Sequence, residues 1–324
     1  MSANIQSSGD LNFYLYGTMN IPTELETNGV CVIPIFNQEE CESMIQDMWK
    51  MLADLTKTMQ VPISEQDNKT WRTLYDLFPK HAMLLQHWGV GHSQFAWNVR
   101  QHPKVSNEFS KLWNVSSTDL ITSFDGVSVH FPPEVTSRGW FRENWLHCDQ
   151  SFTRNELECI QGFVSATHCK PEDATFCYLE GSHKLHKGLA DTYNKQDKSD
   201  WYKLTEEEQT YFTNKGCIKK RLEVPAGSLV LWDSRLIHCG VEPLKARACP
   251  NLRCVVYVCM VPRRLSSEKN QKKRQKAFSE LRMTTHWPMN TKLFPKHPHT
   301  YGKSLPNVSV LETPILSNFG QNLV

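Results

Sequence analysis

Two separated segments of the chain carry side chains that suit a metal ion. Residues 145–149 read Trp-Leu-His-Cys-Asp, and residues 236–240 read Leu-Ile-His-Cys-Gly. In an extended strand, residues two apart point to the same side, so His147 and Asp149 can reach one ion while Cys148 points away. His238 follows a short apolar run and supplies a second imidazole. Two histidines and one carboxylate on one face of Fe(II) leave three coordination positions open for a cosubstrate and dioxygen.

Two further motifs accompany these segments. Between them lies the turn Gly181-Ser-His-Lys184, and beyond His238 an arginine, Arg253, opens the apolar run that ends at Val261. An arginine at the start of a buried strand needs an anion as its partner. The sequence therefore predicts an anion-binding position in addition to the metal ligands.

Taken together, these motifs resemble the phytanoyl-CoA dioxygenase-like family of Fe(II)- and 2-oxoglutarate-dependent oxygenases. The resemblance extends from the strand-like segment 29–35 to about residue 262. Family members usually have Pro-Gly-Ser-His at the turn, where this chain has Glu180 in place of the proline. This departure concerns the shape of the turn and not the metal ligands.

The resemblance implies roles for individual residues. His147, Asp149 and His238 would bind Fe(II), and Arg253 would pair with the distal carboxylate of 2-oxoglutarate, which a planar guanidinium holds with two hydrogen bonds. Arg247 competes for this role because the loop 245–251 leaves the register open, although Arg253 is favoured by its place at a strand start. His130 and Ser128 are candidates for a second cosubstrate contact.

The implied reaction is the O2-dependent oxidation of an unactivated C–H bond in a small molecule, with hydroxylation as the default. Oxidative cyclisation or desaturation of an acidic, amino-acid-like metabolite is the alternative. Related halogenases have a small residue where this chain keeps Asp149, so halogenation is not expected. Arg142 and Arg235 are candidate anchors for an acidic substrate, and Trp145 is a candidate apolar wall.

Two hypotheses from other functional classes remain. A non-catalytic metal-binding cupin could use the same three ligands, but it would not need a carboxylate clamp at Arg253. A nucleic-acid oxidase or demethylase would use the basic segment 263–276 as its footprint. The formal net charge is only +2, and acidic and neutral residues interrupt the segment, so a solvated helix is favoured and nucleic acid is not an expected partner.

The elements around these motifs predict a mainly β fold with flanking helices and a double-stranded β-helix core, of the jelly-roll or cupin-like kind. We expect one domain over residues 1–324. It should have helical support at about 37–115, beginning with a capping box of Asn37 and Glu40, then a jelly-roll core at about 119–262 and a C-terminal wrap over 263–324. The polar insertion 187–216 either covers the active site or is a solvated excursion.

The cysteines and the N-terminus bear on the cellular compartment. The 11 cysteines are scattered singly, and no secretory leader is evident, so we expect reduced, mostly buried thiols and a cytoplasmic protein. The longest apolar run, Cys254 to Val261, is too short to span a bilayer, so a membrane is not an expected partner.

Overall fold

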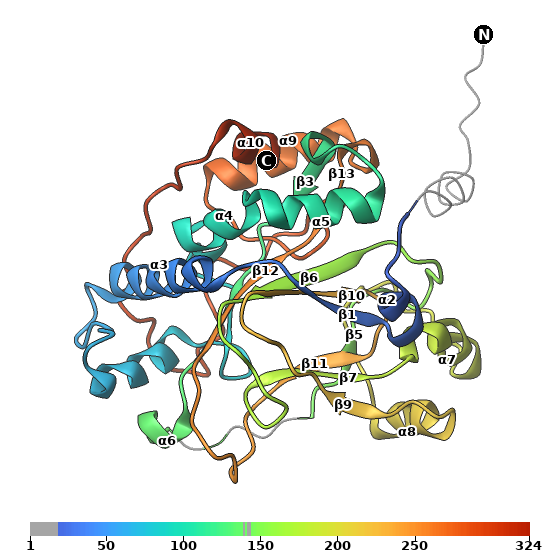
Figure 1. Cartoon of the computed structure of the whole chain (residues 1–324), viewed down its shortest axis with the longest axis horizontal. Helices are drawn as coiled ribbons and strands as arrows, with labels where there is room; N and C mark the ends of the chain where they lie inside the picture. Colours follow the sequence, from blue (N-terminus) through green and yellow to red (C-terminus); the bar gives the residue numbers. More distant parts are fainter. Residues whose placement is uncertain (1–18, 139, 141–143) are drawn as a thin grey trace.

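The computed structural model describes residues 19–138, 140 and 144–324, and two facing β-sheets form its centre (Figure 1). The predicted mainly β jelly roll with flanking helices is confirmed, although the two sheets do not close into a barrel. Neighbouring strands pair antiparallel throughout. One sheet has the order β1 (Val30–Pro34), β10 (Ser228–Asp233), β6 (Ile160–Ser165), β12 (Arg253–Val258), β4 (Val127–His130), β2 (Leu84–Leu85). The other has the order β8 (Tyr202–Lys203), β5 (His147–Cys148), β11 (His238–Val241), β7 (Thr175–Leu179), β9 (Lys219–Arg221), and β13 (Met260–Pro262) pairs separately with β3 (Leu120–Thr122).

The six-stranded sheet is buried on both faces, which explains why its central strands are continuous apolar runs. Phe163 and Val230 lie opposite each other and belong to the cluster between the two sheets. Their neighbours Val164 and Leu231 face the other way and pack in the large cluster beneath the helices. The alternation of side chains along each strand thus divides the interior into two layers.

Three helices pack in the large cluster on the outer side of this sheet, and the first of them begins where the sequence predicts. Glu40 N donates to Asn37 Oδ1 (2.9 Å) and Asn37 N donates to Glu40 Oε2 (2.7 Å), which confirms the capping box. The three are α3 (Gln38–Thr56), α4 (Gln94–Arg100) and α5 (Pro103–Trp113). The other helices are α2 (Thr23–Asn28), α6 (Pro133–Thr136), α7 (His186–Thr192), α8 (Glu206–Asn214), α9 (Glu268–Ser279) and α10 (Asn318–Asn322), with 3₁₀ turns at η1 (Asn68–Leu77), η2 (Val90–His92), η3 (Ser117–Asp119), η4 (Ser182–Leu185) and η5 (Arg263–Leu265).

Several boundaries differ from the sequence prediction. The sheets also recruit β1 and β2, which precede the expected core at 119–262. The apolar run from Arg253 to Val261 is interrupted at Cys259, so that β12 and β13 join different sheets. Strand assignment from residue type alone does not detect such a change of partner.

The basic segment 263–276 forms η5 and the greater part of α9, and it is not wholly solvated. Arg274 is completely buried and donates to the carbonyls of Thr122 (2.6 Å) and Leu323 (3.0 Å). One of the segment's cations therefore serves to join α9 to the C-terminus and the sheet. In the part of the chain that the structure describes, no helix combines the length and apolarity needed to cross a membrane.

All eleven cysteines are free thiols, and ten of them are buried, Cys249 being the exception. This confirms the prediction that the cysteines are mostly buried, and their reduced state stays a prediction. Cysteines that are distant in sequence can still lie close together in the fold. The Sγ atoms of Cys159 and Cys259 lie 3.3 Å apart.

Candidate metal centre

Three side chains that are distant in sequence meet at one end of the five-stranded sheet. His147 lies in β5, Asp149 directly follows that strand, and His238 begins β11, where it pairs with His147. Asp149 Oδ2 lies 3.6 Å from His147 Nε2 and 3.3 Å from His238 Nε2. All three residues are buried, and their potential ligand atoms lie within 4.8 Å of one another. In the described ranges no other group of histidine, cysteine and acidic residues gathers in this way.

The other ring nitrogens of the two histidines are occupied. His147 Nδ1 donates to the carbonyl of Trp145 (3.1 Å), and His238 Nδ1 donates to that of Leu236 (2.9 Å). A carbonyl can only accept, so Nδ1 carries the proton and the Nε2 lone pairs are left for a ligand. Gln161, on β6, donates to Asp149 Oδ2 (3.0 Å). Partners of this kind fix the orientation of metal ligands.

The electrostatic surroundings keep Asp149 and His238 in the forms that bind metals. Burial favours the protonated acid, but the nearby imidazoles of His147 and His286 outweigh it and hold the pKa of Asp149 well below its usual range. Burial lowers the pKa of His238, and His147 lowers it further. A carboxylate and a neutral imidazole at neutral pH are the species that coordinate a divalent ion.

Aromatic rings enclose the two histidines. The Trp145 ring stacks on His147 (centroids 4.8 Å, planes 8° apart), and Phe176 stacks on His238 (5.1 Å, 21°). Trp201 lies 5.9 Å from His147, and 51% of its surface is exposed. Trp201 belongs to the insertion 187–216, whose strand β8 pairs with β5. Part of the insertion therefore borders the candidate metal centre, as one of the two readings of this segment anticipated.

Arg253 occupies the interior between the sheets and has no carboxylate partner within the described residues. Its Nε donates to Ser128 Oγ (3.1 Å), and its Nη1 donates to the carbonyl of Ala174 (3.3 Å). Only 2% of the residue is exposed. The guanidinium lies 5.2 Å from the ring of Phe163, which in turn neighbours Phe176 beside His238. A buried cation without an internal anion is thus connected to the histidines by a series of aromatic rings.

Arg247 and His130 have other contacts. Arg247 is held between two acids, with Nη2 2.8 Å from Glu134 Oε2 and Nη1 2.9 Å from Asp173 Oδ1. His130 lies opposite Arg253 in the sheet, but its Nε2 is 3.2 Å from Glu242 Oε1. Ion pairing within the protein therefore already engages Arg247, whereas Ser128 directly contacts Arg253.

The three residues considered for the substrate fall in different places. Trp145 lines a pocket beside His147 and donates from Nε1 to the carbonyl of Gly240 (2.8 Å). Arg235 is held by Asp233 (Nη2 to Oδ2, 2.7 Å) and also donates to the carbonyl of Asn155 (2.8 Å). Arg142 lies outside the described residues.

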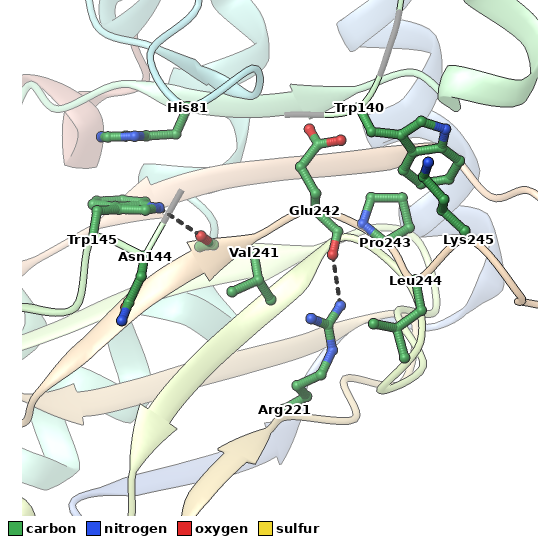
Figure 2. Close-up of a pocket in the computed structure, with 11 residues that line it drawn as sticks. His81, Trp140, Asn144, Trp145, Arg221, Val241, Glu242, Pro243, Leu244 and Lys245 are labelled. Atoms are coloured by element: carbon green, nitrogen blue, oxygen red, sulfur yellow. Dashed lines mark hydrogen bonds between the residues drawn. The ribbon is translucent and has the colours of Figure 1, made fainter. Parts of the chain in front are cut away.

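Sequence reasoning did not single out two side chains near this centre. His81 stacks on the far face of Trp145, with centroids 3.5 Å apart and planes 6° apart, and no local pattern indicates this contact. Glu242 could have been found, because residues two and four after His238 share its face of an extended strand. Glu242 lines the same pocket as Trp145 (Figure 2).

The geometry defines a site of the two-histidine, one-carboxylate class. The phytanoyl-CoA dioxygenase (PhyH) family profile matches residues 25–242, about two thirds of the chain. The chain therefore belongs to the phytanoyl-CoA dioxygenase family, and it is an Fe(II)- and 2-oxoglutarate-dependent oxygenase. The matched region contains His147, Asp149 and His238 but ends before Arg253.

A protein of Aspergillus versicolor named Ava biosynthesis cluster protein O is 28% identical over 240 residues, covering 72% of this chain and 75% of that protein. Among solved structures, HygX from Streptomyces hygroscopicus with nickel, 2-oxoglutarate and hygromycin B is 14% identical, covers 74% of this chain and 84% of its own, and gives a TM-score of 0.43. EctD from S. alaskensis with bound Fe is 12% identical, covers 74% and 75%, and gives a TM-score of 0.48.

Proposed function

We propose that His147, Asp149 and His238 hold the Fe(II) of this oxygenase and that Arg253, oriented by Ser128, holds the distal carboxylate of 2-oxoglutarate. The observation that carries the proposal is the convergence of three buried donors, with Nδ1 of both histidines already bonded to backbone carbonyls and Asp149 Oδ2 held by Gln161. Such a donor set suits Fe(II) because nitrogen and carboxylate ligands match its preference and leave neighbouring positions free.

The protein's own contribution is binding, orientation and exclusion of water. When bound, Fe(II) and 2-oxoglutarate supply the oxidation of a C–H bond by O2, with release of succinate and CO2. Trp145 and Phe176 pack against the two histidines and limit the approach of water. Arg253 offers a fixed, permanently charged fork, so the cosubstrate carboxylate would neutralise a cation that pairs with no carboxylate among the described residues.

We further propose that the substrate is a small molecule and that hydroxylation is the default outcome. Oxidative cyclisation or desaturation during small-molecule biosynthesis is the alternative. The relative from Aspergillus versicolor, whose name places it in a biosynthesis cluster, supports a biosynthetic role. The same centre serves both outcomes, because the position in which the substrate is held decides which of them follows.

The test is an anaerobic titration of the purified apoprotein with Fe(II) and then 2-oxoglutarate, followed by visible absorption. A charge-transfer band that forms only when the keto acid chelates the ferrous ion is expected. It should disappear in His238→Ala and persist in His183→Ala, because His183 is equally buried (5% exposed) but bonds the carbonyl of Glu26 instead. No band in metal-loaded wild-type protein would reject the cosubstrate assignment and favour a non-catalytic metal-binding cupin.

A further inference from the structure

A pocket of about 350 Å³ is lined by residues that adjoin two of the candidate metal ligands in sequence, and Figure 2 shows these lining residues. Its wall includes Trp145, which stacks on His147, and Gly240, which comes two residues after His238 on the same strand. The alternation of side chains puts the Gly240 position on the same face of the sheet as His238. The pocket therefore shares the Trp145 ring with the candidate metal centre as a common wall, and its size falls within the range of small-molecule sites.

Flat rings form two sides of this pocket. At one end, His81 and Trp145 make a parallel stack. At the other end, Trp140 carries Lys245 over its face at 5.7 Å. Figure 2 shows these two aromatic groups on opposite sides of Glu242. Half of the surface of Leu244, which also lines the pocket, is exposed. Exposed apolar side chains between aromatic walls favour a ligand with planar, largely apolar rings.

One polar group of the pocket lacks a partner. The Glu242 side chain is only 8% exposed, and its Oε1 contacts His130 Nε2 (3.2 Å) and an Nη atom of Arg138. Its Oε2 is buried and has no hydrogen-bond partner among the residues that the structure describes. A carboxylate oxygen can only accept a hydrogen bond, and leaving a buried acceptor unpaired is unfavourable. A ligand N–H or O–H would satisfy it, whereas a ligand carboxylate would be repelled.

The positive charge at the rim does not reverse this preference. Lys245 is exposed, so water and salt screen its attraction for an anion. Arg221 also lines the pocket, but its Nη2 donates to the carbonyls of Asp173 (2.7 Å) and Glu242 (2.8 Å). The buried acceptor is thus better placed than either cation to select the polar part of a ligand.

We propose that this pocket binds the substrate and that the substrate is a planar, largely apolar ring system carrying a neutral N–H or O–H donor directed at Glu242. The inference rests on the proposed function, because that function makes the neighbouring centre the place of reaction. It differs from the acidic substrate that the sequence suggested, since Arg235, one of the two arginines expected to anchor an acid, is paired with Asp233, and the other, Arg142, lies outside the described residues.

Three small probes separate planarity from hydrogen bonding: 2-naphthol, 2-methoxynaphthalene, which lacks the donor, and decahydro-2-naphthol, which keeps the hydroxyl but is not planar. Their dissociation constants are measured by anaerobic titration calorimetry on the protein loaded with Fe(II) and 2-oxoglutarate, and the charge-transfer band is recorded for every variant. We expect 2-naphthol to bind about tenfold more tightly than 2-methoxynaphthalene, as for one hydrogen bond to a charged group. It should also bind more tightly than decahydro-2-naphthol, which cannot stack on the aromatic walls.

Variants then locate the binding. Leu244→Trp should fill the pocket and abolish binding of 2-naphthol, whereas Leu305→Trp, at an equally exposed leucine (49%) that does not line the pocket, should not. Glu242→Gln should remove the preference for 2-naphthol over its methyl ether. Equal affinities for the three probes, or unchanged binding in Leu244→Trp, would overturn the proposal.

Formation of the charge-transfer band tests the proposed function separately from the assignment of the pocket. If the wild type forms the band and binds no 2-naphthol, the pocket assignment alone is rejected. If the wild type forms no band, the proposed function is rejected, and the titrations are repeated on metal-free protein. In the metal-free protein, loss of 2-naphthol binding in Leu244→Trp would still support the assignment of the pocket, and retained binding would reject that assignment.

Discussion

Replacing Arg253 by methionine tests the assignment of the cosubstrate clamp against its competitor, Arg247. A bidentate clamp contributes two charge-assisted hydrogen bonds, together about 3 to 4 kcal/mol, so Arg253→Met should weaken 2-oxoglutarate binding by a factor of about 10² to 10³. Arg253→Lys keeps the charge but loses the fork, and an intermediate loss of about tenfold is expected. The fold should tolerate methionine, because the acceptors near Arg253 among the described residues are neutral: Ser128 Oγ, the carbonyl of Ala174 and the Tyr257 hydroxyl.

The matched variant is Arg247→Met, for which the structure predicts the opposite pattern. This change removes the ion pairs with Glu134 and Asp173, and Asp173 is only 5% exposed. Stranding a buried carboxylate should destabilise the protein by about 1 to 3 kcal/mol. Affinity for 2-oxoglutarate should not change, because Arg247 is engaged by these acids.

The assay is the anaerobic 2-oxoglutarate titration of the Fe(II) protein at the charge-transfer band, with thermal unfolding of each variant in parallel. Affinity should fall for Arg253→Met, and Tm should fall for Arg247→Met. A larger loss of 2-oxoglutarate affinity in Arg247→Met than in Arg253→Met would refute the reasoning and assign the carboxylate clamp to Arg247.

Three further expectations concern pH, the metal and the fold. Burial lowers the pKa of His92 to about 4 from an ordinary value of 6.5. The neutral His92 side chain therefore contributes fully to stability above pH 6.5, and this contribution is lost as pH falls toward 4, with about 2 kcal/mol lost at pH 5. The free energy of unfolding of His92→Gln should therefore depend less on pH between 7.5 and 5 than that of the wild type, and parallel curves would contradict this. Gln161→Leu removes the hydrogen bond to Asp149 and should weaken metal binding by about 10- to 100-fold in a competition titration, whereas an unchanged affinity would count against the orienting role. Asn37→Ala removes the cap of α3 and should reduce the free energy of unfolding by about 1 kcal/mol without affecting the charge-transfer band.

The meeting of the three candidate ligands could be predicted because each segment that carries them has a local signal. The two-residue spacing of His147 and Asp149 survives in a strand as short as β5, and the apolar run before His238 indicates another buried strand. The helix starts at Asn37, Ser93 and Pro103 were predictable for the same reason, since each residue caps or begins a helix through contacts within one turn.

Features that depend on partners far along the chain could not be predicted. His81 reaches Trp145 from a loop in which His81 and Ala82 both adopt positive φ (51° and 60°), and neither residue type indicates that conformation. Similarly, the basic composition of 263–276 gives no sign that Arg274 would be buried, because burial depends on carbonyls of β3 and the C-terminus. The composition of a segment gives its net charge, but tertiary contacts determine which of its charged side chains are buried.

The shortness of β5 has a consequence for how metal occupancy and order are connected. β5 has two residues, and a single residue pair, His147 with His238, joins it to β11. An ion bound by both histidines acts as a cross-link that closes the loop between residues 147 and 238, restricting the chain as a covalent clip does. At a metal concentration 100 times the dissociation constant, this linkage would stabilise the fold by about 2.7 kcal/mol. The iron would thus take part in the reaction and also hold β5 against β11.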